Sequence, residues 1–144
     1  MAYYRIKAAD KHSSVLDSVM DRVYKIASKK EQKDALILVS KLEYAKKDKR
    51  LERILGATMF EYLVKRRENT VGLADVNVEV HPYEYITTTP YRAHEKTIVV
   101  LNPSLSDLEE KFNKLNNYSD FIVVEMHSDG ELDEWVKKNQ AIEL

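Results

Sequence analysis

Basic side chains gather at three places in the first half of the chain, and clustered cations are the residues that bind phosphate. If consecutive elements run up and down, the first and third clusters lie at one end of the domain and the second lies at the opposite end. The first and third clusters form the predicted nucleic-acid-binding patch: Lys29, Lys30, Lys33, Lys65, Arg66 and Arg67. The second cluster consists of Lys46, Lys47, Lys49 and Arg50. The alternative needs no ligand, because a basic residue at a helix C-terminus gains about 0.3–1 kcal/mol from the helix dipole.

A second pattern pairs Glu with His at the ends of two Val-rich stretches, VEVH and VEMH. Residues two apart share one face of a strand, so Glu79 can converge with His81, and Glu125 with His127. Two such strands side by side would present two carboxylates and two imidazoles to Zn²⁺ or Mn²⁺, and His94 in a predicted loop could add a ligand. Glu-x-His is a weak motif, and polar residues at strand ends explain it equally. The four residues are therefore weak metal candidates, and the sequence predicts no cofactor.

Tyrosines form a third group, around the stretch HPYEYITTTPYR. Tyr83, Tyr85 and Tyr91 lie near Arg92, where they could stack on bases or anchor a protein partner. Packing of the same rings on a sheet face is the alternative.

Signals for catalysis are poor. His127, Ser128 and Asp129 are adjacent in the chain, but a catalytic triad is defined by spatial geometry and not by adjacency. There is no cysteine nucleophile, and the three glycines are isolated, so no phosphate-binding glycine loop exists. These observations lower the odds of an enzyme without excluding one.

The elements that must position these residues begin with a strand over 2–8 and a helix from Ser13 or Ser14 to Lys29. Residues 31–47 suit both a helix and a buried strand, and we expect a helix. Residues 48–67 carry a full apolar stripe and predict the strongest helix of the chain, capped by Asp48. Gly56 inside this helix costs about 1 kcal/mol relative to Ala, which indicates close approach of another element.

The second half changes to a strand pattern. Val76, Val78 and Val80 alternate within the strand expected over 75–81. The remaining predicted elements are a strand over 83–88, a loop over 90–95, a strand over 96–101, a helix from 102–104 to a stop at Asn116–Asn117, a strand over 120–126, and a last short helix whose capping box is Ser128 and Glu131. The unit 96–126 is a βαβ unit, which requires a parallel strand pair.

Composition restricts the class of protein. The 144 residues have a formal net charge of −1, 44% hydrophobic and 33% charged residues, and no Cys, so a disulfide framework is excluded. No apolar run is long enough to span a membrane and no leader pattern opens the chain, so we expect a cytoplasmic protein without membrane contact. The 16 Lys and 14 Glu with only two Gln resemble the composition of hyperthermophile proteins.

The small net charge hides an asymmetry. Residues 1–70 hold 17 Lys/Arg and 10 Asp/Glu, a net of +7, whereas residues 71–144 hold 6 and 14, a net of −8. Such a split indicates a polyanion partner or self-association of unlike faces, unless the two halves pack together and neutralise each other.

These patterns predict a single domain over 1–144, with a basic helical half over about 1–70 and an acidic α/β half over about 71–144. The expected fold is α/β with an α+β tendency: a helix-rich N-terminal half packed on a mixed sheet, with the βαβ unit in the C-terminal half. The first functional hypothesis is a non-catalytic binding or adaptor protein that contacts nucleic acid or a nucleoprotein assembly, with a protein partner for its acidic half. The alternatives are a small metal-assisted hydrolase or nuclease, and a structural homo-oligomer.

Overall fold

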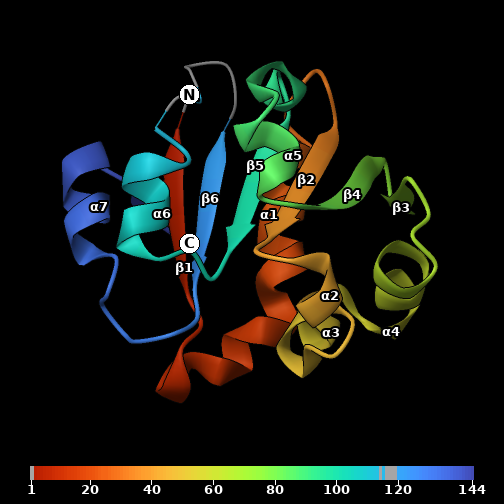
Figure 1. The fold of residues 1–144 in the computed structure, drawn as a ribbon, viewed down its shortest axis with the longest axis horizontal. Coiled ribbons are helices and arrows are strands. Elements are labelled where there is room, and N and C mark those ends of the chain that lie inside the picture. The colour runs from red at the N-terminus through yellow and green to blue at the C-terminus, as the bar shows by residue number, and fades with distance from the viewer. Residues whose placement is uncertain (1, 114, 116–119) are drawn as a thin grey trace.

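A seven-stranded sheet forms the centre of the computed structural model, which describes residues 2–113, 115 and 120–144 (Figure 1). The strands lie in the order β3-β4-β2-β5-β6-β1-β7, and every neighbouring pair is parallel except β3 with β4. Their bounds are β1 (Tyr3–Lys7), β2 (Asp34–Val39), β3 (Val71–Leu73), β4 (Val76–Pro82), β5 (Thr97–Leu101), β6 (Phe121–Glu125) and β7 (Ile142–Glu143). The sheet therefore has an amino end, where the parallel strands begin, and a carboxyl end, where they finish.

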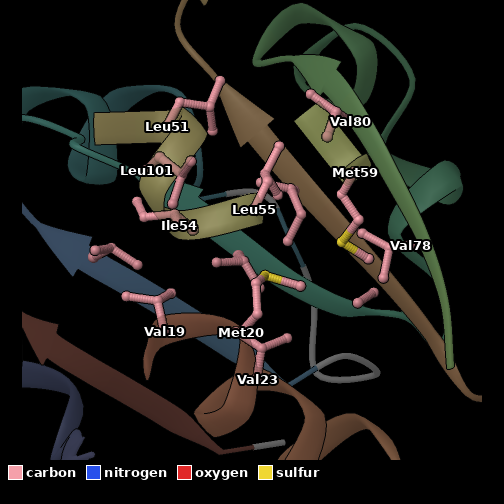
Figure 2. Close-up of a cluster of buried hydrophobic side chains, with 14 of the residues drawn as sticks. Val19, Met20, Val23, Leu51, Ile54, Leu55, Met59, Val78, Val80 and Leu101 are labelled. Atoms are coloured by element: carbon pink, nitrogen blue, oxygen red, sulfur yellow. The ribbon is translucent and has the colours of Figure 1, made fainter. Parts of the chain in front are cut away.

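Helices cover both faces of this sheet, because successive side chains of the buried strands point to opposite sides. On the first face, Ile37 of β2 packs in a core with side chains of η1 (Asp10–Ser18), α1 (Val19–Ala27), α2 (Leu42–Ala45), α3 (Lys49–Leu55), α4 (Ala57–Met59) and the π-helix η2 (Phe60–Lys65). Figure 2 shows part of this core, where α1, α3 and α4 meet the valines of β4. On the second face, Leu36 and Leu38 pack in a core with α5 (Glu84–Thr87), η3 (Pro90–Ala93), α6 (Leu105–Glu110) and α7 (Asp133–Asn139).

The α/β class is confirmed, and so is the parallel βαβ pair, since β5 and β6 are parallel neighbours joined through α6. Strand predictions at β1, β4, β5 and β6 are also confirmed. The helical layer is not confined to the N-terminal half, however, because α5, α6 and α7 cover the second face. None of the helices in the described residues is long and apolar enough to cross a membrane.

The helix expected over 31–47 is wrong for its first part. Residues Asp34–Val39 form β2, which lies between β4 and β5 near the middle of the sheet, and Ala35 to Val39 are all buried. A parallel strand that is covered on both faces has an unbroken apolar sequence, so its periodicity does not distinguish it from a buried helix. Only the short α2 is helical in that range.

The long helix expected over 48–67 is also divided. Asp48 caps it as predicted, since its Oδ1 accepts from Arg50 N at 2.9 Å and Leu51 N at 3.2 Å. Gly56 then adopts φ +84° and separates α3 from α4. A Cβ built on Gly56 would meet nothing within 4 Å, so this glycine provides a turn and not a close contact.

Other boundaries shift for local reasons. The strand expected over 83–88 is the helical turn α5, which follows directly on Pro82 at the end of β4. The first helix begins as the 3-10 helix η1 at Asp10, and the last helix begins at Asp133, so the serines predicted as caps do not cap either one. Ser104 forms a capping box with Asp107 at the start of α6. The helix stop predicted at Asn116–Asn117 lies outside the described residues.

Candidate functional site

The first predicted basic cluster lies in the turn between α1 and β2, at the amino end of the sheet. Lys30 Nζ lies 2.6 Å from Asp120 Oδ2, and Lys33 Nζ lies 2.7 Å from Asp75 Oδ2. The hydrogen bond from Lys33, joined by one from Tyr24, lowers the pKa of Asp75 from 3.8 to about 2. Two of the three lysines in this cluster are thus committed to carboxylates of the acidic half.

The third predicted cluster does not join the first. Lys65 and Arg66 pair with Glu61 on their own helix, and Arg67 donates to the carbonyl oxygens of Leu63 and Val80. Val80 lies three residues further along β4 than Asn77, whose N–H donates to Lys33 O. The third cluster is therefore displaced from the amino end by about 10 Å along the strand.

The reason for this separation is the break at Gly56. The prediction that both clusters lie at one end assumed a single helix running from the carboxyl end of the sheet back to the amino end. The chain instead changes direction after α3. The return to the amino end is completed by β3, which runs antiparallel to β4. The six residues of the predicted patch therefore lie at two levels of the sheet, and four of them, Lys30, Lys33, Lys65 and Arg66, have carboxylate partners within the protein.

The metal candidates are not brought together either. Glu79 and His81 are on β4, whereas Glu125 and His127 are at the end of β6, and strands β2 and β5 lie between them. Within the described residues, no group of three or more His, Asp or Glu could hold a metal ion. The similar sequences VEVH and VEMH therefore mark the ends of two separate strands and do not form one site.

Glu79 and His81, the pair on β4, have partners close by. Glu79 contacts His81 Nε2 at 3.3 Å and Lys96 Nζ at 3.0 Å, and its hydrogen bond with His81 is the main cause that lowers the pKa of the carboxyl. The His81 ring stacks on Tyr85 at 3.7 Å between centroids, and Arg92 covers Tyr85 at 4.4 Å. This stack explains one of the predicted tyrosines as packing.

Glu125 is fully buried and belongs to a structural ion cluster. It accepts from Gly130 N at 2.8 Å and Leu132 N at 3.0 Å, and it lies 3.1 Å from Arg5 Nη1. Arg5 also bonds to Asp133 on α7 and to Glu143 on β7. Burial acts to lower the pKa of Arg5, but the bonds to Glu143 and Asp133 outweigh it and raise the pKa. The cluster joins three strands and a helix through one cation, Arg5, that three carboxylates share.

Ion pairs between the two halves neutralise much of the charge asymmetry. Basic-half residues of β1, η1 and the α1–β2 turn pair with acidic-half residues: Arg5 with Glu125, Asp133 and Glu143; Lys7, Lys11 and His12 with Asp129; Lys30 with Asp120; and Lys33 with Asp75. The halves interleave in the sheet, because β2 lies between β4 and β5 and β1 between β6 and β7. Packing of the halves on each other therefore accounts for much of the split.

The second basic cluster takes no part in these ion pairs. It lies at the carboxyl end, on the segment between β2 and the start of α3, where α2 and α3 meet the lower end of the sheet in Figure 1. We call residues 41–50 the basic segment; its five exposed cations are Lys41, Lys46, Lys47, Lys49 and Arg50. Arg50 Nη1 donates to Met126 O at 2.8 Å, which ties the segment to the end of β6. No ion pair joins any of the five to a carboxylate of the described residues. The segment also contains Glu43 and Asp48, so its net charge is +3.

The basic segment borders one of the points where neighbouring strands lead their connections over opposite faces of the sheet; β6 and β1 form another. The chain leaves β2 over the first face towards β4, and it leaves the neighbouring β5 over the second face towards β6. Ligands of open α/β sheets bind in the crevice outside the carboxyl ends of two such strands. A crevice of about 70 Å³ lies there, lined by Val39, Ser40, Lys41, Tyr44, Ala45, Asp48, Leu51, Leu101, Asn102 and Met126. It is much smaller than the roughly 300–1,000 Å³ of a small-molecule site, so this edge suits contact with an extended ligand.

A second hollow of about 500 Å³ lies between α6 and α7 on the second face. Its lining is aromatic in part, with Tyr3, Phe121 and Trp135, and it carries two carboxylates, Glu109 and Glu134, against one cation, Lys138. That lining does not favour an anionic ligand.

The sequence had identified the Lys46–Arg50 cluster and placed it at the end opposite Lys29–Lys33, which agrees with the structure. The sequence analysis did not identify Lys41, Tyr44 or Asn102 as neighbours of that cluster. Asn102 follows β5, a different strand, so only the tertiary structure brings it there. No protein family, curated protein or solved structure shows a significant similarity to this chain.

Proposed function

We propose that this protein is a non-catalytic binding or adaptor protein that contacts nucleic acid, alone or in a nucleoprotein assembly, through the basic segment. The observation that carries the proposal is the set of five exposed cations at the carboxyl end that no described carboxylate neutralises. Several cations of the basic half elsewhere, among them Lys30 and Lys33, are engaged in ion pairs within the protein. Exposed Lys and Arg that lack internal partners bind phosphates by releasing the condensed counterions of the nucleic acid.

The position of the segment supports the same function. It adjoins the crevice outside the carboxyl ends of β2 and β5, one of the places where an open α/β sheet binds ligands. The rival metal-assisted hydrolase or nuclease rested on Glu79, His81, Glu125 and His127, which lie on separated strands. We therefore do not propose that activity.

The test is fluorescence anisotropy with labelled RNA and DNA, repeated from about 50 to 200 mM salt. The informative variant is Lys46→Gln/Lys47→Gln/Lys49→Gln, and the matched control is Lys29→Gln/Lys65→Gln/Arg66→Gln, which removes the same charge from the patch predicted by sequence alone. Each phosphate contact contributes about 0.7 to the logarithmic salt slope for a single strand, so the first variant is expected to lower the slope by about 2. The control is expected to retain the slope of the natural sequence.

Two results would contradict the proposal. One is the absence of binding by the natural sequence at the lowest salt concentration. The other is a greater loss of affinity in the control than in the Lys46/Lys47/Lys49 variant, which would move the phosphate contact to the amino-end residues.

A further inference from the structure

Tyr44 is the aromatic residue at the centre of the basic segment, and its ring is unusually open to solvent. Its exposed fraction is 63%, whereas the described aromatic residues of the two cores are buried or partly buried. Lys41 Nζ lies 5.7 Å from the ring centroid, and the hydroxyl has no hydrogen-bond partner in the described residues. In its present position the ring leaves apolar surface in contact with water. Contact with an apolar or aromatic face of a ligand would bury that surface.

The other exposed tyrosines have different surroundings. Tyr62 is 38% exposed and is covered by Arg66 at 5.0 Å from its centroid. Tyr91 is 77% exposed, but it lies in η3 and outside the basic segment. Tyr44 is therefore the exposed ring of the described residues that sits among unpaired cations.

From this juxtaposition we infer that the ligand of the basic segment is single-stranded nucleic acid, with one base stacked on the face of Tyr44 while the surrounding lysines contact the backbone phosphates. The inference rests on the proposed function and names the form of nucleic acid that it binds. Proteins that bind single strands combine these two features, because every base has a π-face and every linkage carries a charge.

The size of the crevice beside Tyr44 favours a base that stacks on the ring over a base that inserts into the crevice. At about 70 Å³ it is far smaller than the roughly 300–1,000 Å³ of a small-molecule site, so it does not enclose a nucleotide. Ser40 and Asn102 are exposed at its lining, where their hydroxyl and amide can bond the edge of a stacked base. A duplex keeps its bases stacked on each other and presents no free face to Tyr44.

The experiment compares three probes of about twelve nucleotides: a thymine single strand, an abasic strand with the same number of phosphates, and a GC-rich duplex. The natural sequence is expected to bind the thymine strand more tightly than the other two at equal salt. Tyr44→Ala is expected to weaken thymine-strand binding by about 5- to 150-fold, the loss expected for one stacked base, and to leave abasic-strand binding and the salt slope unchanged. Tyr44→Phe keeps the ring and is expected to bind as the natural sequence does.

Tyr91→Ala is the matched control, since it removes an exposed ring from another surface. The inference is overturned if the abasic strand binds as tightly as the thymine strand, or if Tyr44→Ala and Tyr91→Ala behave alike. In either case salt-dependent binding would leave the phosphate contact standing, so the stacking inference would fail alone. Absence of binding to all three probes would overturn the proposed function as well.

Discussion

Lys33 and Lys47 are both lysines of short connections in the basic half, but their surroundings differ. Lys33 is held 2.7 Å from Asp75, and its pKa is raised by that hydrogen bond. Lys47 is exposed and has no carboxylate partner in the described residues. An exposed ion pair contributes little to stability, but it removes a cation from those available to a ligand. Lysines that look equivalent in a sequence are thus separated by the carboxylates the fold brings beside them.

Asp75 makes the stability of the protein depend on pH in acid. Its folded pKa of about 2 lies below the ordinary 3.8, so the stabilisation is present above pH 3.8 and is lost as the pH falls towards 2. Asp75→Asn cannot ionise, so its melting temperature should change less over this range than that of the natural sequence. Thermal melts at several pH values check this, and identical pH profiles for the two proteins would contradict it.

Arg5 tests the importance of the buried ion cluster. Arg5→Met would leave the fully buried Glu125 without its cation, a type of change that costs about 3–5 kcal/mol. Arg53→Met removes an arginine whose pair with Asp17 is exposed to solvent, so it should cost much less than Arg5→Met. Urea unfolding of both variants measures the difference. Equal losses would mean that the Arg5 cluster contributes no more than a surface pair.

At the scale of elements, Gly56 determines where the basic residues of η2 end up. With φ +84° it ends α3, so the path turns and η2 ends beside the middle of β4 instead of at the amino end. The apolar stripe of 48–67 persists across the break, because α3, α4 and η2 all pack on the same core. An amphipathic pattern therefore reports which residues are buried and does not report whether the helix is continuous.

Gly56→Ala should cost about 1–3 kcal/mol, because φ +84° with ψ 156° lies in a backbone region that is essentially restricted to glycine. No steric contribution is expected, since a Cβ there meets nothing within 4 Å. Gly72→Ala is the control: its φ is ordinary and its Cβ would meet Ala74 O at an unstrained 3.8 Å, so its effect should be near zero. Urea unfolding compares the two, and a Gly56→Ala protein as stable as the natural sequence would refute the assigned role.

At the scale of the whole molecule, the basic and acidic halves share one sheet. Strands of the two halves alternate in the sheet, and ion pairs such as Lys30 with Asp120 cross between them. The homo-oligomer predicted from the charge split stays a prediction. Ion pairs within one chain already neutralise many of the opposite charges that would attract a second copy. Five cations that have no carboxylate partner in the described part of the chain lie together at the carboxyl end, on the basic segment.

This interleaving predicts cooperative unfolding. Amide hydrogen exchange should give the same opening free energy for β2, from the basic half, and for its neighbour β5, from the acidic half. The reason is that neither strand can keep its ladder when the other leaves. Measurably different opening free energies for the two strands would show that the halves unfold separately.

The sequence by itself determined the local features of this protein. The alternation of Val76, Val78 and Val80, the cap at Asp48 and the βαβ unit follow from side-chain periodicity, hydrogen bonding within a few residues and right-handed crossovers, which are all short-range effects. The position of the Lys46–Arg50 cluster opposite Lys29–Lys33 followed from the same reasoning. Apart from the βαβ unit, which pairs two strands that are consecutive in the chain, these predictions did not depend on which strands pair.

Only the tertiary structure decided what depends on strand order. The strand identity of β2 comes from burial on both faces, which a sequence pattern does not specify. The separation of Glu79 from Glu125 follows from the two strands inserted between them, and the neutralisation of Lys30 and Lys33 follows from carboxylates more than forty residues away in the sequence. The candidate site likewise needed Tyr44 and Asn102 beside one crevice, because long-range pairing sets which strand ends become neighbours.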